Sequence, residues 1–203
     1  MYDVDIREPL FDYLDETYGK NRILEEKTMG RSRADVIMLI EYEFIGLEIK
    51  SDSDTYSRLK RQARDYNQYC DRNFIVIGKS HEKHVQEHIP KEWGVIRAAW
   101  EEGQISVRQL REALPNPKVK LERQLEWMWR PELNRILEQN ALPAYKRKSK
   151  RFVQEKLLAK VLPNLLKKQM CEELFERDYT LWEEQLQAYR QEQNRPIQRK
   201  VKY

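Results

Sequence analysis

Two carboxylates and a lysine lie inside segments that otherwise have the character of buried β-strands. Asp35 interrupts the apolar run 34–40, and Glu48 and Lys50 lie in the run 45–50. Burial of an unpaired carboxylate is costly, so these side chains need partners. Two acids and a lysine that converge would suit metal-assisted hydrolysis of a phosphodiester, in which the lysine positions an attacking water.

The alternation of side chains along a strand indicates whether these three groups can meet. Glu48 and Lys50 share one face of their strand, and the short connection 41–44 predicts a hairpin that sets Asp35 opposite Glu48 to within about one residue. Two carboxylates that close repel each other, and a Mg²⁺ ion between them removes the conflict. The alternative is an ordinary cross-strand ion pair, because Glu-x-Lys is a common tripeptide.

A helix is expected over residues 55–70, because apolar residues recur there with a period of 3.6. Arg58, Gln62 and Tyr66 follow one edge of its apolar stripe at positions i, i+4 and i+8. A short buried strand is expected over residues 73–78. The order strand, strand, helix, strand predicts an α/β core in which the polar edge of the helix leans over the acidic strands.

This pattern resembles the PD-(D/E)xK nuclease superfamily, in the branch whose next helix carries a Gln-x-x-x-Tyr motif. The matching residues are Asp35, Glu48-Ile49-Lys50, Gln62 and Tyr66. Residues 31–98 are also similar to MmcB-like DNA-repair proteins and related bacterial nuclease-like proteins. Ala34 stands where the family name has proline. The resemblance implies a restriction-endonuclease-like core, a small mixed sheet flanked by helices, within residues 1–115.

The resemblance also implies a deoxyribonuclease that depends on Mg²⁺ or Mn²⁺. Asp35, Glu48 and the backbone carbonyl of Ile49 would hold the metal. Lys50 would orient the water, and Gln62 and Tyr66 would support the site or the nucleic acid backbone.

Many members of this superfamily add a glutamate from their first helix. Glu8 is the expected residue here, in a short amphipathic helix over residues 5–14 that has Pro9 in its first turn and Asp3 or Asp5 as its cap. Glu26 is the competitor for this role. An ordinary solvated position is the alternative for Glu8.

Basic residues near the acidic strands and in the second half of the chain are candidates for contacts to phosphates. Near the strands these are Arg31, Arg33 and Arg58, although Arg31 and Arg33 could instead pair with Glu25 or Glu26. The second set is Lys146, Arg147, Lys148, Lys150 and Arg151, together with Arg195, Arg199, Lys200 and Lys202. A solvated loop is the alternative for residues 146–151.

Charge divides the chain into two parts. Residues 1–115 hold 18 Lys and Arg against 22 Asp and Glu, whereas residues 116–203 hold 20 against 12. Two prolines in the segment 114–117 mark the boundary. Helical apolar faces in the second part predict a basic helical subdomain over residues 116–203, or helices packed on the core. These faces comprise Leu121, Leu125, Met128 and Trp129; Leu133, Ile136 and Leu137; Phe152, Leu157, Leu158, Val161 and Leu162; Leu165, Leu166 and Met170; and Leu174, Phe175, Tyr179, Trp182 and Leu186.

Other features of the sequence narrow the class of protein. His81, His84 and His88 fit the polar face of a connecting helix better than a zinc site. Two distant cysteines predict reduced thiols; no segment resembles a signal peptide, and no apolar run approaches the length of a membrane span. We therefore expect a cytoplasmic protein without a membrane association.

The favoured function is cleavage of DNA, or RNA, through Asp35, Glu48 and Lys50. The alternative is a catalytically silent module that binds nucleic acid or a partner within a repair, mobile-element or defence complex. The helical half would serve a protein partner or a homodimer as well as its own core.

Overall fold

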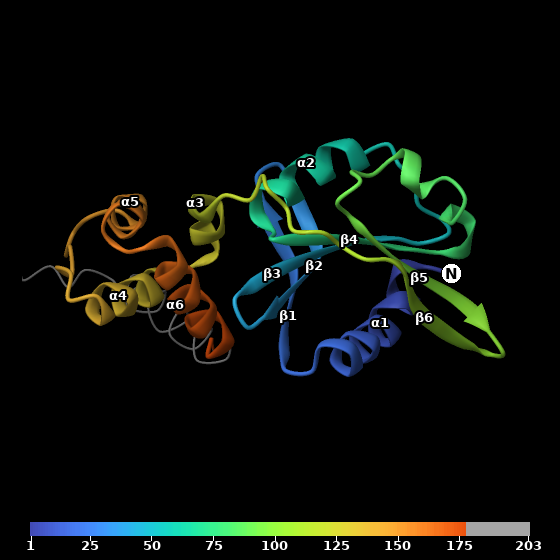
Figure 1. Ribbon diagram of the computed structural model, residues 1–203, viewed down its shortest axis with the longest axis horizontal. Helices are drawn as coiled ribbons and strands as arrows, with labels where there is room; N and C mark the ends of the chain where they lie inside the picture. The colour runs from blue at the N-terminus through green and yellow to red at the C-terminus, as the bar shows by residue number, and fades with distance from the viewer. Residues whose placement is uncertain (178–203) are drawn as a thin grey trace, which may run out of the picture.

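The fold is built on one mixed sheet of six strands in the order β1-β2-β3-β4-β5-β6. The computed structural model describes residues 1–177, and Figure 1 shows helices on both faces of the sheet. The pairs β1/β2, β2/β3 and β5/β6 are antiparallel, whereas β3/β4 and β4/β5 are parallel. The strands are β1 (Asn21–Met29), β2 (Ser32–Ile40), β3 (Glu43–Lys50), β4 (Arg72–Ile77), β5 (Gly94–Glu101) and β6 (Gln104–Arg111).

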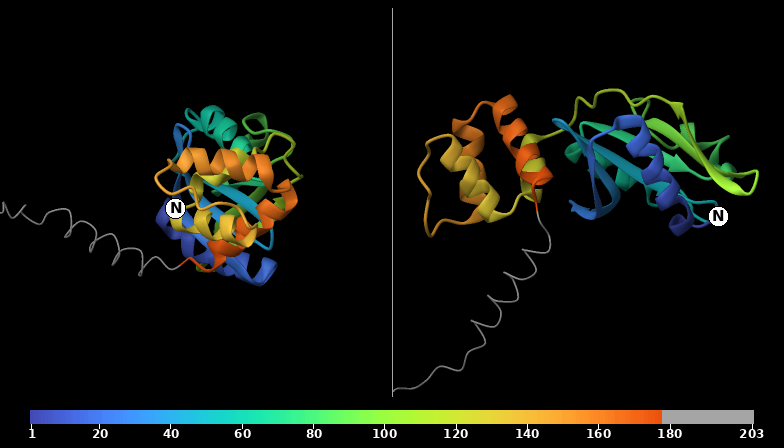
Figure 2. Two further views of the ribbon diagram at one scale, coloured as in Figure 1. Left: turned by 90° about the vertical axis from the view of Figure 1, so that its left-hand side faces the viewer. Right: turned by 90° about the horizontal axis from the view of Figure 1, so that it is seen from below.

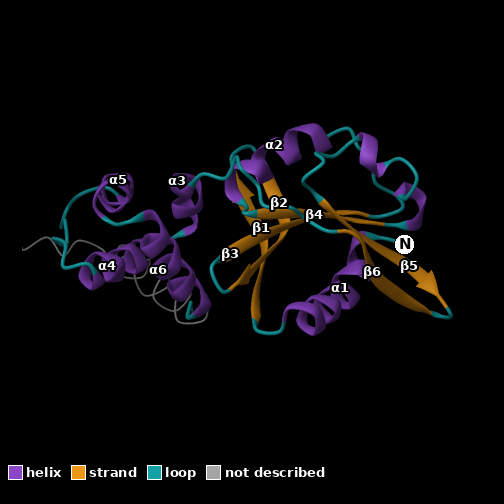
Figure 3. Cartoon of the chain, viewed as in Figure 1, coloured by secondary structure: helices purple, strands orange, loops and turns teal. Residues whose placement is uncertain are grey.

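Each face of the sheet is covered by a different helix, as the cartoon in Figure 3 shows. Helix α1 (Asp3–Tyr18) buries Ile6, Leu10 and Leu14 against one face. Helix α2 (Leu59–Tyr69) connects β3 to β4 and covers the other face. Because side chains alternate along β2, Val36 and Met38 face α1, whereas Ile37 and Leu39 belong to the α2 side. The prediction of an α/β core with a helical C-terminal extension is confirmed.

Within residues 1–177, four α-helices follow the sheet after a linker over residues 112–120. They are α3 (Leu121–Gln124), α4 (Arg130–Gln139), α5 (Lys150–Lys160) and α6 (Pro163–Phe175), and Figure 2 shows them gathered beside one end of the sheet. Trp127 connects the two parts, since its ring lies 5.3 Å from that of Phe44 and its Nε1 donates to the Thr28 carbonyl at 3.0 Å. One apolar cluster therefore continues from the α2 side of the sheet into the helices. The division into residues 1–115 and 116–203 stays a prediction.

Several helix boundaries differ from the sequence-based expectation. Helix α1 begins at Asp3, so Pro9 lies inside it rather than in its first turn, and the Asp5 carboxylate accepts the backbone N–H of the N-cap residue Tyr2 at 2.7 Å. Helix α2 begins at Leu59 rather than at residue 55. The expected histidine-bearing helix is replaced by two 3-10 turns, Lys79–His81 and Val85–Glu87.

The helical half also differs in detail from its predicted apolar faces. The segment 121–129 is not one helix, because α3 gives way to a 3-10 turn, Leu125–Trp127, before α4 begins. Leu162 and Leu165 are exposed, because α5 ends at Lys160 and Pro163 begins a new helix in another direction. The predictions for Tyr179, Trp182, Leu186 and the basic residues 195–202 lie outside the described residues. Cys70 and Cys171 are buried free thiols.

Candidate active site

Strands β2 and β3 part at the point where Asp35 and Glu48 face each other. Their ladder runs from Ile40 opposite Glu43 to Val36 opposite Leu47, and the next step of this register sets Asp35 against Glu48. Beyond this point the side chain of Asp35 replaces the ladder bond, because its Oδ2 accepts the Ile49 N–H at 2.8 Å. The predicted hairpin and its register are confirmed.

Tyr66 holds the two strands at this separation. Its hydroxyl donates to the Leu47 carbonyl at 2.9 Å and accepts the Asp35 N–H at 3.1 Å. The side chain is fully buried, so both bonds form away from competing water. The tyrosine of the Gln-x-x-x-Tyr pattern therefore positions the backbone of both acidic strands.

A glycine lets α2 approach the sheet closely enough for this contact. A Cβ atom on Gly46 would lie 2.5 Å from Cδ1 of Tyr66 and 2.8 Å from Sγ of Cys70. Real Cβ atoms do not approach other heavy atoms so closely, so a larger residue would push α2 outward. The close packing at Gly46 is what brings Gln62 and Tyr66 within reach of β3.

Glu48 lies at the centre of the site and is completely buried. Its Oε1 accepts the Lys50 ammonium at 2.6 Å and also the side-chain amide of Gln62. Its Oε2 has no hydrogen-bond partner among the described residues, and neither has Oε1 of Gln62. Two buried acceptor oxygens without donors are costly, and a donor or a cation from outside residues 1–177 would satisfy them.

The two carboxylates of the site are held in surroundings that disfavour their charged forms. Burial, reinforced by the nearby Glu48 carboxylate, raises the pKa of Asp35 to about 7, although the Ile49 N–H and Lys50 act against this shift. Burial also raises the pKa of Glu48, and Lys50 opposes that rise. One ammonium thus faces two carboxylates, and a divalent cation would relieve the remaining repulsion.

These residues fit a magnesium or manganese ion. The described residues 1–177 hold no group of three His, Cys, Asp or Glu side chains placed to bind a metal together. Asp35 and Glu48 could supply two carboxylates, and the carbonyl of Ile49 lies between Glu48 and Lys50 in the chain. Mg²⁺ often takes only one or two carboxylates from a protein and keeps several waters, so two acids suffice.

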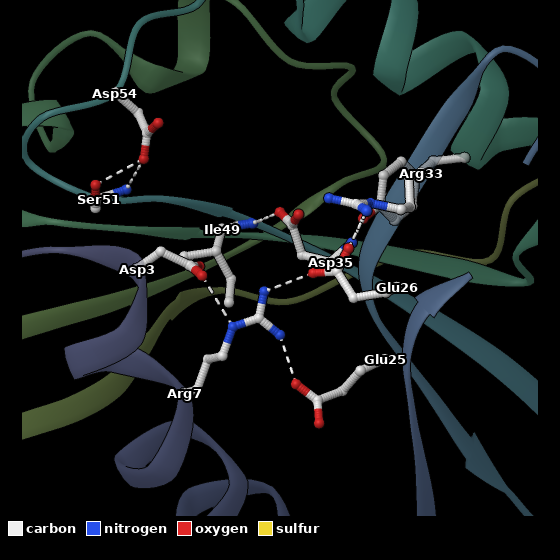
Figure 4. Close-up of polar contacts among 10 residues, drawn as sticks. Asp3, Arg7, Glu25, Glu26, Arg33, Asp35, Ile49, Ser51 and Asp54 are labelled. Atoms are coloured by element: carbon white, nitrogen blue, oxygen red, sulfur yellow. Dashed lines mark hydrogen bonds and ion pairs between the residues drawn. The ribbon is translucent and has the colours of Figure 1, made fainter. Parts of the chain in front are cut away.

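The structure does not bring Glu8 to this site. Glu8 is exposed, whereas Asp3 and Arg7 lie on the side of α1 that approaches Asp35, as Figure 4 shows. Asp3 and Arg7 share that side because they are four residues apart in α1, whereas Glu8 lies about 100° further around the helix. The negative charge of Asp3 contributes to the raised pKa of Asp35. Sequence reasoning missed Asp3 as a neighbour of the site, and its i, i+4 spacing from Arg7 was the available signal.

Glu26, the competitor, is held in ion pairs. Arg7 Nη2 lies 3.1 Å from its Oε1, and Arg33 Nε lies 2.5 Å from its Oε2. Arg7 also binds Asp3 at 2.9 Å and Glu25 at 2.6 Å (Figure 4). For Arg33 the expected alternative, pairing with Glu26, is the arrangement observed.

The other predicted phosphate contacts are dispersed. Arg31 and Arg58 are exposed and have no ion pair with the described residues. The basic residues 146–151 lie in the helical half, around the start of α5, on the side of the molecule away from the N-terminus (Figure 1). There Lys150 Nζ donates to the Glu126 carbonyl at 2.8 Å and Arg151 pairs with Glu155 at 3.0 Å. This cluster does not join the carboxylates.

The histidines also lie apart from the carboxylates. His81 is buried, and its Nε2 lies 2.9 Å from the Ser51 carbonyl. His88 stacks on Tyr56, with ring centroids 4.2 Å apart. His84 is exposed beside Glu87. Their environments differ because two 3-10 turns, rather than one helical face, carry them.

The fold and the site define an α/β protein in which a buried glutamate and a partly buried aspartate meet where two strands of a mixed sheet separate. The sequence model of the bacteriophage P4 protein cII family matches residues 2–199, and the chain belongs to this family. No curated protein matches the sequence.

One solved structure that is similar to this chain is SfsA of Pyrococcus furiosus in complex with Ca²⁺. The two are 15% identical with a TM-score of 0.31, over 55% of this chain and 60% of that chain. The match thus spans less than two thirds of the SfsA chain. No helix within residues 1–177 is long and apolar enough to cross a membrane.

Proposed function

We propose that the protein is a metal-dependent nuclease of the PD-(D/E)xK type that hydrolyses phosphodiester bonds in DNA. The observation that carries this proposal is the convergence of Asp35, Glu48 and Lys50 where β2 and β3 part, with Oε2 of Glu48 left without a partner in the part of the chain that the structure describes. Membership in a family named for a bacteriophage protein suits a role in a mobile genetic element.

Each residue of the site has a defined task in this proposal. A Mg²⁺ or Mn²⁺ ion held by Asp35, Glu48 and the Ile49 carbonyl would supply Lewis-acid polarisation of the phosphodiester and a lower pKa for the attacking water. Lys50, whose ammonium lies 2.6 Å from Glu48, positions that water and offsets negative charge on the phosphate.

Two residues of α2 support these groups without touching the substrate. Gln62 donates its amide to Glu48 and so fixes the carboxylate rotamer. Tyr66 binds the backbones of β2 and β3 and so holds them at the separation at which Asp35 Oδ2 accepts the Ile49 N–H. Arg31 and Arg58 are exposed cations that could meet the DNA backbone.

The test is cleavage of supercoiled plasmid and of single-stranded DNA with Mg²⁺ or Mn²⁺. Glu48→Gln and Lys50→Met keep the size of each side chain and remove its charge, so each should reduce the cleavage rate by about 10²-fold or more. Glu16→Gln removes an exposed carboxylate of α1 and should leave the rate unchanged. Circular dichroism checks that every variant is folded.

Cleavage that EDTA, Glu48→Gln and Lys50→Met each abolish would establish the activity and its site together. Cleavage that survives Glu48→Gln would assign the activity to another site or to a contaminant. If the wild-type protein binds DNA and cuts nothing with either metal, the protein is instead a silent binding module.

A further inference from the structure

A groove of about 580 Å³ runs along the outer side of α2, away from the carboxylates. Neither Asp35, Glu48 nor Lys50 lines it. Three segments form its walls: α2, the turn before β5, and the linker between β6 and α3. The lining residues are Lys60, Ala63, Arg64, Asn67 and Gln68; Glu87, His88, Ile89 and Pro90; and Lys118 and Lys120.

Four cations rim this groove without acidic partners. Lys60 and Arg64 are exposed one turn apart on α2, and Lys118 and Lys120 are exposed in the linker. None of the four has a side-chain hydrogen bond or an ion pair with residues 1–177. Glu87 is the one acid in the lining, and it already pairs with His84 at 3.2 Å. Unpaired cations along a concave surface attract a polyanion.

The linker is fastened to α2, so the cations keep their positions relative to each other. The Lys120 N–H donates to the Gln68 carbonyl at 3.0 Å. The side-chain amide of Asn116 donates to the carbonyls of Asn67 and Cys70 at 2.8 and 2.7 Å. The groove is therefore a built feature of the fold rather than a chance meeting of two mobile segments.

The floor of the groove is apolar and partly aromatic. Ala63, Ile89 and Pro90 contribute apolar surface, and the exposed His88 stacks on Tyr56 with an interplanar angle of 28°. Tyr56 belongs to the loop that connects Lys50 to α2, so this pair joins the groove to the loop that leaves the candidate active site. Apolar and aromatic surface beside cations suits unpaired bases followed by their phosphates.

We propose that this groove binds a segment of single-stranded DNA, with phosphates on Lys60, Arg64, Lys118 and Lys120 and a base against His88. The inference rests on the proposed function, because it names the strand that α2 would guide to the carboxylates. The inner side of α2 supports the catalytic groups through Gln62 and Tyr66, and its outer side holds the strand. A duplex fits less well, since its bases are stacked inside and cannot reach the apolar floor.

The experiment is binding of a fluorescent oligothymidine to the full chain, measured by anisotropy in EDTA over a range of salt concentrations. Lys60→Glu/Arg64→Glu should weaken binding by about tenfold or more, and lower the slope of log K against log salt by about 1.4, because each lost phosphate contact removes about 0.7. The matched control is Lys20→Glu/Lys160→Glu, which makes the same charge change at exposed positions outside the groove. It should change neither quantity by a comparable amount.

A second pair of variants tests the base contact. His88→Ala should weaken binding by about tenfold through lost stacking, whereas His84→Ala, exposed nearby but not in the lining, should not. Equal losses in the groove and control variants would overturn the proposal, as would the absence of binding by the wild-type protein. Duplex binding that is as tight and depends equally on the groove would overturn the preference for a single strand.

Because EDTA prevents cleavage, this assay separates the two proposals. A wild-type protein that binds through the groove but never cuts would support the groove and disprove the nuclease. Normal cleavage by the wild type, together with binding that Lys60→Glu/Arg64→Glu does not weaken, would support the nuclease and disprove the groove.

Discussion

Two glutamates of this chain, Glu48 and Glu132, are almost completely buried beside a cation, yet their surroundings differ. Arg177 donates two hydrogen bonds to Glu132, from Nε to Oε1 at 2.6 Å and from Nη2 to Oε2 at 2.7 Å. The N–H of Trp129 adds a bond to Oε2 at 2.5 Å, and the guanidinium lies 4.0 Å from the Trp129 ring. Both carboxylate oxygens are satisfied by the chain itself.

Within residues 1–177, one oxygen of Glu48 is satisfied and the other has no partner, and Asp35 adds a second negative charge beside it. The chain is evidently able to complete a buried carboxylate, as it does at Glu132. The comparison therefore indicates that Glu132 serves the junction between sheet and helices, whereas Glu48 keeps an acceptor oxygen available for the metal ion that we propose.

The largest expected change in stability would come from breaking the complete pair. Glu132→Gln should lower the free energy of unfolding by about 3 kcal/mol, because it removes the carboxylate charge that accepts two hydrogen bonds from the buried Arg177 guanidinium. Glu48→Gln should cost less than about 1.5 kcal/mol, because it also removes the repulsion with Asp35. Urea denaturation followed by tryptophan fluorescence measures both. Equal losses of stability in the two variants would show that Glu48, like Glu132, is an ordinary structural ion-pair partner.

A smaller effect of opposite sign is expected at Asp35. Without metal at pH 8, Asp35→Asn should raise the free energy of unfolding by about 2 kcal/mol, because the fold disfavours the ionised carboxylate of Asp35 and asparagine carries no charge. Asparagine retains an oxygen that can accept the Ile49 N–H. The change is measured by urea denaturation in EDTA, and a loss of stability would contradict the raised pKa.

The pH dependence of the difference in stability between the wild type and Asp35→Asn gives a sharper test. The pKa of Asp35 is raised from 3.8 to about 7 in the folded protein, so its destabilising effect is complete above pH 7 and disappears as the pH falls toward 4. The advantage of Asp35→Asn over the wild type should shrink across this window. Above pH 7, Mg²⁺ should raise the melting temperature of the wild type and not of Asp35→Asn, since a bound ion stabilises only the folded site.

The smallest effect concerns the support of the site. Tyr66→Phe should lower the free energy of unfolding by about 1.5 kcal/mol, because the Leu47 carbonyl and the Asp35 N–H lose a partner in a buried place. Tyr69→Phe is the matched control on the same helix, because its side chain is also buried but the partners of its hydroxyl, Gly30 and Glu126, are exposed to water. It should cost about 0.5 kcal/mol. A larger loss at Tyr69 would show that the strand separation does not depend on Tyr66.

The central elements of the fold could be predicted because their patterns are local. The apolar runs of β2, β3 and β4 and the stripe of α2 each identify an element within about ten residues, and the short connection between β2 and β3 sets their register. The strands β1, β5 and β6 were not predicted. Edge strands mix polar and apolar residues along both faces, as the partly exposed pattern of β6 shows, so their periodicity is weak.

The partners of individual charges were harder to predict than the elements. Asp3 lies near Asp35 because the helix begins two residues earlier than expected, which adds Asp3 to its first turn one turn before Arg7, whereas Glu8 is exposed on another side of the helix. The groove beside α2 joins residues about 60 positions apart in the chain, and no local pattern connects Lys60 to Lys118. The Gly46 contact that brings α2 close to β3 is likewise long-range.

The sequence by itself determined that two acids and a lysine would lie on adjacent strands, because strand alternation and a short hairpin leave little freedom of register. Only the tertiary structure decided which oxygens of these acids are satisfied and which are left open. That depends on the packing of α2 and α1 against opposite faces of the sheet, where burial removes water and leaves each charge only the partners that the fold brings within hydrogen-bond distance.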